Sequence, residues 1–551
     1  MNILRSGPTI PLLLFVFSCA LYAINLNKAP DFDELYHILA AHGYLKTGAF
    51  SIADGLYQRG RVFTWLVAKL FSVFGEHRWV ARLPSVVSVA LMASLLFVWL
   101  RARTGNLAAL LTALLFAVSP FAVDTAQFAR FYGVHAFAFL AACFAIYAAV
   151  VEQEAWTRRI GFAVVGMLAL AVAMYFQVTT LIGIVGLGVW GGLYVVVPWL
   201  LRRDVTVARK RALVVGGIAL MLIVLVVGLA TGKLQAAFVM FRNTPMWAAE
   251  NAGNVVFYHT WFVLFYPTLW TLLPMLTVIA LVAAPRPVFF AMVIFGVGIL
   301  LHSLAGNKSL RYVFYLMPFI FTIWGVALAT VLRRTISFMR RHATAAITYA
   351  LPGRAAAGGL AAVVVALGVV WLLVANAATI RTVTLLADIT VPPAQPAPRW
   401  DVVRQVLHDE LENSDVILTS TELDAIYYLG DYDVLISKSR YGEVLSQGMG
   451  KQEFDLDRRT GRPVIASPEA VEKVIRCYPT GLLITPAFRW RRGPMIDDEV
   501  ADLVVREMEP VELPKGTHLL AFRWSHPALG AAQDCPVIAH SRAASTSAET
   551  R

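Results

Sequence analysis

The sequence predicts a polytopic α-helical membrane protein with a polar α/β domain at its C-terminal end. Hydrophobic residues make up 58% of the 551 residues and charged residues 15%, whereas soluble proteins average about half apolar and a quarter charged. Apolar runs long enough to cross a bilayer recur from Thr9 to Ala378. After Val391 these runs stop, and the Pro-rich stretch VPPAQPAP leads into a polar region.

The transmembrane helices are counted by length, because a bilayer core takes about 20 apolar residues per helix. We expect about eleven spans. The first of them is a retained helix and not a signal peptide, because no clean cleavage site follows it. The segment 62–74 is apolar but too short to span, which favours an interfacial helix. The expected spans are 9–26, 83–100, 107–123, 133–151, 160–176, 181–200, 212–230, 257–282, 288–304, 313–332 and 356–378.

The basic residues indicate the topology, because Lys and Arg concentrate in cytoplasmic loops. Arg clusters fall in every second loop, from Arg5 through the loop 202–211 to 333–354. This pattern places the N-terminus in the cytoplasm. The loops 27–82, 124–132, 231–256 and 306–312, and everything after the last span, then lie outside the cytoplasmic membrane. The alternation of the Arg clusters also explains the net charge of +12, and it indicates membrane lipids and not nucleic acid as the partner.

Four regions follow from this division. Residues 1–390 form the membrane domain, with an acidic first loop at 27–82, and 391–400 form a Pro-rich linker. Residues 401–530 form the α/β domain, with a helix at 401–412 and buried strands at 415–419, 434–437, 482–485 and 518–522. Residues 531–551 are rich in Ala and Ser and are expected to be disordered. Cys477 and Cys535 form a disulfide or stay as two buried thiols, and the sequence leaves both open.

Three acids stand at the end of the first span: Asp31, Asp33 and Glu34. A carboxylate that faces lipid loses its hydration, so these acids are expected in a water-filled cavity, as candidates for chemistry. The alternative is that they complement the dipole at a helix start. His37 lies one helical turn after Asp33. A hydrogen-bonded pair is favoured over a metal site because two ligands are too few, although a divalent metal stays open.

Two basic clusters lie on the predicted outer side. Arg59, Arg61 and Arg82 carry the planar fork that suits phosphate recognition, and the alternative is that they reach the lipid headgroups. Lys308 and Arg311 stand on the side where cations are disfavoured. A bound phosphate or anionic headgroups would explain them.

A third group lies between two spans, where Asp124 and Arg130 pair or face a substrate. A tyrosine accompanies the arginine of this group and that of the Lys308 cluster. Tyr132 follows Arg130, and Tyr312 follows Arg311. Carboxylates and cations around one mouth suit group transfer from a membrane-embedded phosphate donor. A carboxylate takes a proton from the acceptor, and cations stabilise the leaving phosphate.

At these positions the sequence resembles the GT-C glycosyltransferases. The motifs are the acids after the first span, RLPS, Arg-x-Tyr, the late KxxRY before Pro318, and ELDAIYYLG in the tail. The nearest branch contains bacterial protein O-mannosyltransferases, the lipid A aminoarabinose transferase and galacturonosyl transferases. The resemblance implies an inverting enzyme that uses a polyprenyl-phosphate sugar and an extracytoplasmic acceptor at the inner membrane, with Asp33 or Glu34 as the base and Asp124 in the place of a second acid.

Two other classes compete with this interpretation. A transporter or lipid flippase would line its path with buried acids and bases, but it is expected to carry charges near the middle of its spans. A catalytically silent scaffold would bind a partner through its tail domain. The identity of the sugar and of the acceptor does not follow from the sequence.

Overall fold

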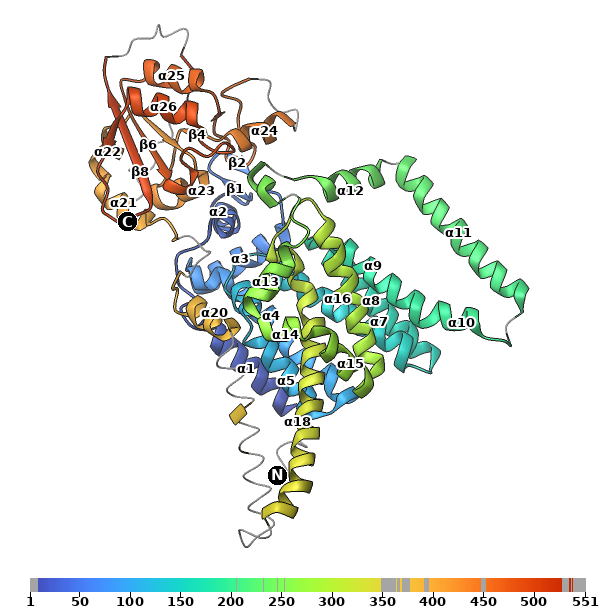
Figure 1. Ribbon diagram of the computed structural model, residues 1–551. Helices are drawn as coiled ribbons and strands as arrows, with labels where there is room; N and C mark the ends of the chain where they lie inside the picture. The colour runs from blue at the N-terminus through green and yellow to red at the C-terminus, as the bar shows by residue number, and fades with distance from the viewer. Residues whose placement is uncertain are drawn as a thin grey trace. The chain divides into compact units, whose positions relative to one another are not determined.

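The computed structural model describes residues 8–204, 206–230, 232–244, 246–251, 253–347, 363, 367–368, 377–390, 396–446, 452–527, 535–536 and 538 (Figure 1). Most of the predicted last span 356–378, the first half of the linker and nearly all of the tail lie outside these residues. The chain divides into two compact units. The membrane unit comprises Met1–Leu26, Arg82–Thr244 and Ala248–Ile389, and the second unit comprises Asn27–Ala81, Pro245–Trp247 and Thr390–Arg551.

The membrane unit is a bundle of apolar helices. Its helices and those that adjoin it are α1 (Thr9–Ala23), α4 (Arg78–Thr104), α5 (Asn106–Ala117), α6 (Pro120–Ala126), α7 (Tyr132–Tyr147), η2 (Ala148–Glu152), α8 (Trp156–Phe176), α9 (Thr180–Gly191), η3 (Gly192–Val196), α10 (Val197–Leu201), α11 (Val207–Ala230), α12 (Lys233–Arg242), η4 (Met246–Asn251), α13 (Phe257–Phe265), α14 (Pro267–Thr271), α15 (Leu273–Ala283), α16 (Pro285–Leu304), α17 (Leu310–Val313), η5 (Phe314–Leu316), α18 (Met317–Ile347) and α20 (Ala377–Leu386).

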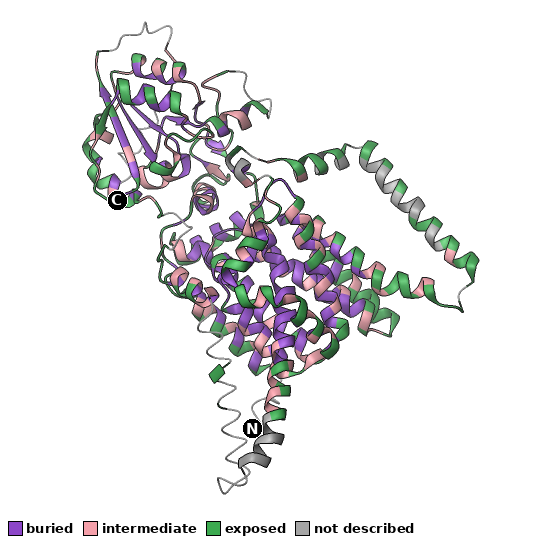
Figure 2. Cartoon of the chain, viewed as in Figure 1, coloured by how far each residue is buried: buried purple, intermediate pink, exposed green. Residues whose placement is uncertain are grey.

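Burial differs strongly among these helices (Figure 2). The most apolar window of the span Leu310–Phe338 is 83% buried, whereas that of α8 is 17% buried. The exposed side chains of α8 are themselves large and apolar, among them Phe162, Met167 and Leu168. Because contiguous apolar surface of this kind is not left in contact with water, α8 faces lipid and α18 forms the bundle core.

Proline residues change the predicted spans. The expected helix 257–282 consists of three pieces, α13, α14 and α15, because Pro267 and Pro274 lack the N–H that a continuous helix needs. The expected helix 107–123 bends by 56° between α5 and α6, where Ser119 caps α6 and Pro120 begins it. Among the described residues, six helices are long and apolar enough to span, or seven if the bent pair counts as one span. The expected eleven spans are thus found in part.

The second unit begins with the first loop. It folds into α2 (Phe32–Thr47), a hairpin of β1 (Ser51–Ile52) and β2 (Gly55–Leu56), and α3 (Arg61–Phe74). The predicted short helix at 62–74 is confirmed as α3. Phe63, Val67 and Phe71 are buried, whereas Trp65 and Phe74 are exposed, so α3 is amphipathic.

A six-stranded sheet forms the rest of this unit (Figure 1). The strand order is β5-β4-β3-β6-β8-β7; β3, β4, β5 and β6 run parallel, and β8 pairs antiparallel with β6 and β7. All four predicted strands are present. The strands are β3 (Val416–Thr419), β4 (Val434–Ile436), β5 (Val464–Ile465), β6 (Thr480–Pro486), β7 (Glu509–Val511) and β8 (Leu519–Ser525).

Helices cover the sheet, because its strands carry apolar side chains on both faces. Val416 and Leu418 pack with α25 and α26, and Leu482 and Ile484 pack with Trp400 of α21. A disulfide joins Cys477 to Cys535. The helices are α21 (Trp400–Val406), α22 (His408–Asn413), α23 (Glu422–Asp424), η6 (Ala425–Leu429), α24 (Lys438–Ser446), α25 (Pro468–Cys477), η7 (Ala487–Arg489) and α26 (Asp498–Glu507).

The hairpin of the first loop packs directly on a turn of the sheet domain. The Asp54 N–H donates to the Thr460 carbonyl at 3.1 Å, and the Leu56 N–H donates to the Arg458 carbonyl at 2.9 Å. A Cβ on Gly55 would lie 2.3 Å from the backbone of Arg459, so only glycine permits this approach. The first loop and the sheet domain, which lie far apart in the sequence, therefore share one unit.

Candidate active site

The acidic stretch forms the start of α2. The Asp33 N–H donates to Asp31 Oδ1 at 2.9 Å, and the Asp31 N–H donates to Glu34 Oε2 at 2.8 Å. This is a capping box, which satisfies two N–H groups that a helix start leaves unpaired. Asp31 and Glu34 thus have a structural role, and Glu34 is only 1% exposed. Asp33 is half-buried and sits in the first turn, where its carboxylate also benefits from the helix dipole.

His37 lies one turn further along α2 and is fully buried. Its Nδ1 is 2.8 Å from Thr64 Oγ1 of α3. The rings of Tyr57 and Phe63 pack against its imidazole edge to face. These contacts join α2 to α3. Among the residues that the structure describes, no group of three or more His, Cys, Asp or Glu side chains is placed to hold a metal ion.

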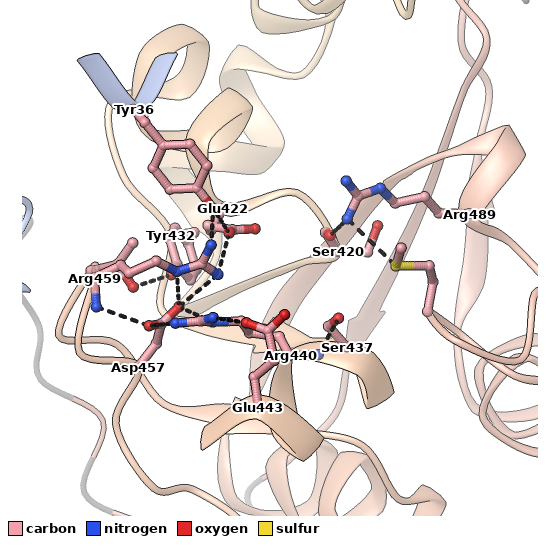
Figure 3. A network of polar contacts seen from close by, with 12 residues as sticks. Tyr36, Ser420, Glu422, Tyr432, Ser437, Arg440, Glu443, Asp457, Arg459 and Arg489 are labelled. Carbon is pink, nitrogen blue, oxygen red and sulfur yellow. Dashed lines mark hydrogen bonds and ion pairs between the residues drawn. The ribbon is translucent and has the colours of Figure 1, made fainter. Parts of the chain in front are cut away.

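A network of charged side chains joins α2 to the sheet domain (Figure 3). The guanidinium of Arg459 contacts Tyr36 Oη and lies 3.0 Å from Glu422 Oε1. Its carbon lies 5.1 Å from the centroid of the Tyr36 ring. Arg459 also contacts Asp457 at 3.2 Å, and Asp457 in turn binds Arg440. The face of α2 that follows Asp33 is thereby held by one half-buried arginine.

The charged side chains of this network are poorly hydrated, and burial shifts their pKa values. Burial, with the nearby Asp457, raises the pKa of Glu422 to about 7. Burial likewise raises the pKa of Asp424 to about 7, and nearby Glu422 and Asp31 raise it further, while Arg489 opposes the shift. Burial lowers the pKa of Arg459 to about 9, with Asp33 acting in the opposite direction. Asp33 therefore lies within the field of Arg459, and carboxyls that titrate near neutrality surround the start of α2.

A second arginine of the sheet domain lies at the first residue of α2. The guanidinium carbon of Arg489 lies 5.1 Å from the centroid of the Phe32 ring, within the range of a cation–π contact. Its Nη1 donates to the Ser420 carbonyl at 2.5 Å. Burial lowers the pKa of Arg489, whereas Glu422 and Asp424 raise it.

The membrane unit has a pocket of its own, with charged residues in a mostly apolar lining. It has a volume of about 90 Å³ and is lined by Asp124, Arg311 and Arg381. Its remaining walls are mostly apolar and aromatic, and include Trp261 and Phe265. Two predicted site residues from distant helices, Asp124 and Arg311, thus line one cavity. Two guanidinium groups and one carboxylate leave a net positive charge among the lining residues.

Two other predicted cations of the membrane unit do not line this pocket. Arg82 is buried and donates to the Leu26 carbonyl at 2.6 Å. Lys308 is buried and donates to the carbonyls of Ala305 and Asn251 at 2.7 and 3.2 Å. Both cations thus satisfy backbone carbonyls, and their assignment to a donor phosphate stays a prediction.

The remaining predicted residues of the membrane unit contact aromatic rings. The guanidinium carbon of Arg130 lies 5.4 and 5.9 Å from the ring centroids of Phe131 and Tyr132. Tyr132 and Tyr312 have ring centroids 6.2 Å apart, and the guanidinium of Arg311 lies 4.6 Å from the Phe128 ring. In the second unit, Arg59 and Arg61 are exposed at the start of α3.

Several residues of these two sites were not predicted from the sequence, among them Glu422, Arg459, Arg489 and Arg381. Glu422 belongs to the motif ELDAIYYLG, which indicated the resemblance but no chemical role. Arg459 lies in a turn and Arg489 in the three-residue helix η7, and neither segment is long enough to show a periodic pattern. Arg381 follows the last apolar run, where an arginine is ordinarily interpreted as a membrane boundary.

Known membrane glycosyltransferases share the fold of this chain. The chain has the fold of the GT-C membrane glycosyltransferases, which confirms the resemblance found in its motifs. It is similar to ArnT from Cupriavidus metallidurans in the apo state, with a TM-score of 0.58 and 14% identity over 96% of this chain and 100% of that chain. The same protein bound to undecaprenyl phosphate gives a TM-score of 0.57 at 13% identity, with the same coverage.

Two further comparisons extend this result. The archaeal oligosaccharyltransferase AglB from Archaeoglobus fulgidus, in complex with an inhibitory peptide and a dolichol-phosphate, gives a TM-score of 0.51 at 12% identity. The match covers 88% of this chain and 70% of the AglB chain. Residues 58–229 match the family model described as Dolichyl-phosphate-mannose-protein mannosyltransferase. No curated protein sequence matches the chain.

Proposed function

We propose that this protein is an inverting glycosyltransferase that moves a sugar from a polyprenyl-phosphate donor to an extracytoplasmic acceptor. The observation that carries the proposal is the pocket in which Arg311 and Arg381 meet among aromatic side chains. Paired guanidinium groups bind phosphate through planar forks. The structurally similar ArnT was solved with undecaprenyl phosphate bound, which supports this choice of donor.

In the proposed reaction Asp33 is the general base. Its carboxylate takes the proton of the acceptor hydroxyl, and the hydroxyl oxygen attacks the anomeric carbon of the sugar. The bond between that carbon and the phosphate oxygen breaks, and polyprenyl phosphate leaves with the electron pair. A single displacement inverts the anomeric configuration. Arg311 and Arg381 stabilise the charge that develops on the leaving phosphate.

The capping geometry supports Asp33 over Glu34 as the base. Glu34 accepts a bond from the N-cap and is buried, so its carboxylate is already used in the structure of α2. Asp33 is more exposed, which a group that meets an acceptor requires. We place the protein in the cytoplasmic membrane with its N-terminus inside and its sheet domain outside, because the Arg clusters alternate between loops.

Donor titration tests the proposal. Wild type and the Arg311→Ala, Arg381→Ala and Arg286→Ala variants are purified in one detergent, and each is titrated with a polyprenyl-phosphate sugar. Loss of one charge-assisted hydrogen bond costs about 1.5 to 3 kcal/mol, or about 10- to 150-fold in affinity. Arg311→Ala and Arg381→Ala should show this loss. Arg286 is exposed at the start of α16 and does not line the pocket, so Arg286→Ala is the matched control.

The size of the arginine effect separates a phosphate fork from a simple charge. Arg311→Lys should restore part of the affinity, because a point charge replaces the planar fork. Equal donor affinity in wild type, Arg311→Ala and Arg381→Ala would remove the pocket from the donor site.

A further inference from the structure

A second pocket lies in the sheet-containing unit, beside the C-terminal half of α2. It has a volume of about 500 Å³ and is bounded by α2, the β1–β2 hairpin, the segment 76–78 and η6. Binding pockets for small molecules commonly measure about 300 to 1,000 Å³. This pocket involves none of the residues that form the capping box or the arginine network, so it is a separate feature of the same unit.

Close packing of backbone builds one wall of this pocket. A Cβ on Gly43 of α2 would lie 2.2 Å from the carbonyl oxygen of Ser51 in β1. Glycine therefore lets the hairpin approach the helix. The approach places the hydroxyls of Ser51 and Thr47 at the lining. The Thr47 hydroxyl donates to the Gly43 carbonyl at 2.9 Å, so toward a ligand it can only accept, whereas the Ser51 hydroxyl can donate or accept. The wall thus presents hydroxyl groups on a closely packed support.

The lining residues carry an excess of positive charge. Lys46 and Arg78 are cations, and the one carboxylate among the lining residues is that of Glu76. This carboxylate contacts Nδ1 of His42. Two cations against one paired carboxylate favour an anionic ligand, since an anion that enters the pocket is attracted by the surplus charge.

The aromatic ring of Tyr427 contacts one of these cations, Arg78. The Arg78 guanidinium lies 5.7 Å from the centroid of the Tyr427 ring, and its Nε donates to Tyr427 Oη at 3.0 Å. These contacts hold the side chains of Arg78 and Tyr427 in a defined position, which lowers the entropy cost of binding. An aromatic ring with an apolar face and a polar edge, next to hydroxyls, suits a ligand that alternates C–H and O–H groups.

We propose that this pocket binds a carbohydrate unit that carries a negative charge, as a carboxylate or as a phosphate. Arg78 and Lys46 bind the charge, Tyr427 packs on the apolar face of the sugar, and Thr47 and Ser51 hydrogen-bond to its hydroxyls. His42 and Asp33 lie nine positions apart on α2, or about 13 Å along the helix axis. Within the proposed transferase, on which this last step rests, the unit belongs to the acceptor and a short oligosaccharide spans that distance.

Direct binding tests the pocket without donor or turnover. The full chain, purified in detergent, is titrated by calorimetry with digalacturonic acid, with glucosamine 1-phosphate and with the neutral disaccharide galactobiose. The first two probes separate carboxylate from phosphate as the source of the charge. We expect one or both anionic probes to bind at least about tenfold more tightly than galactobiose, as one charge-assisted hydrogen bond provides.

Variants of the two cations make the test specific. Arg78→Ala should weaken the anionic probe by about tenfold or more. Lys46→Glu should also do so; Lys46 is exposed, so this variant is expected to fold even if Arg78→Ala does not. Lys69→Ala is the matched control, since Lys69 is an exposed cation of α3 that does not line the pocket.

The outcomes separate this proposal from the transferase function. Anionic binding that is lost in Lys46→Glu and kept in Lys69→Ala supports the pocket, whether or not the protein transfers sugar. Equal binding of neutral and anionic probes, or unchanged binding in Lys46→Glu, overturns it. It is also overturned if wild type binds neither anionic probe at 10 mM, which is about ten times the Kd of a weak ligand bound with 4 kcal/mol. A chain that transfers sugar but fails these titrations refutes the pocket alone.

Discussion

Replacing Arg459 by alanine should release α2 from the sheet domain. In the structure Arg459 contacts Tyr36 of α2 together with Glu422 and Asp457 of the sheet domain. The carboxylates of Glu422 and Asp457 are 5% and 0% exposed, so the substitution leaves buried negative charge uncompensated. Removal of one partner of a buried ion pair costs about 3 to 5 kcal/mol.

The lower end of this range applies here. Asp457 keeps its bonds to Arg440, and Glu422 can take up a proton because burial has raised its pKa to about 7. A cost of about 3 kcal/mol corresponds to an increase of about 150-fold in the opening equilibrium of α2. The increase should be larger at pH 8 than at pH 5.5, since Glu422 is protonated at the lower pH and no longer needs a cation.

Hydrogen exchange with mass spectrometry measures this opening in the full chain in detergent. Peptides from Phe32–Thr47 are compared in wild type, Arg459→Ala and Arg458→Ala. Arg458 is the adjacent exposed arginine, so its variant controls for the loss of one positive charge. Faster exchange confined to the Arg459→Ala variant supports the reasoning. Identical protection of α2 in all three proteins at pH 8 would show that the network does not hold the helix.

Three further predictions concern chemistry, pH and topology. Asp33→Asn should lower sugar transfer by about 10²- to 10⁴-fold, the usual contribution of a general base, whereas Glu34→Gln preserves the capping box and should lose less; transfer assays that rank the two in reverse would exchange their roles. The raised pKa of Glu422, about 7 against 4.5, stabilises the fold fully below about pH 4.5, and this stability is lost as pH rises to about 7; the melting temperature should therefore fall between pH 5 and pH 8, and Glu422→Gln should flatten that slope. A cysteine at the exposed Lys515, in a chain whose two free cysteines are replaced by serine, should react with an impermeant reagent in intact spheroplasts, and protection until lysis would reverse the topology.

Local patterns of apolar residues predicted many of the helices and strands. The periodic apolar runs predicted membrane helices such as α4 and α8, and the short apolar runs near 416, 434, 482 and 519 predicted four strands of the sheet. Where prolines interrupted an apolar run, as at Pro267 and Pro274, hydropathy alone predicted one span although the backbone forms three helices. Composition reports the burial of a segment, but hydrogen bonding decides whether its helix continues.

The acids of α2 show the same division for the site. Their sequence separation predicted a cluster, and it also predicted both of its uses, capping and catalysis. The structure shows that Asp31 and Glu34 cap the helix and that Asp33, which is half-buried, is more exposed than Glu34. A capping box is read from the spacing of two residues, but which carboxylate stays accessible depends on the packing around it.

The sequence by itself determined that this is a multi-pass membrane protein, because the hydrophobic effect acts on each apolar run through local composition. It also determined the residue types near the membrane boundary, since charge is excluded from lipid wherever it occurs in the chain. Only the tertiary structure decided that Asp124 and Arg311 line one pocket with Arg381, and that Arg459 lies against Tyr36. These contacts join segments separated by as many as 423 positions, and no local pattern specifies them, because they depend on how complete elements pack and on where a buried charge finds its partner.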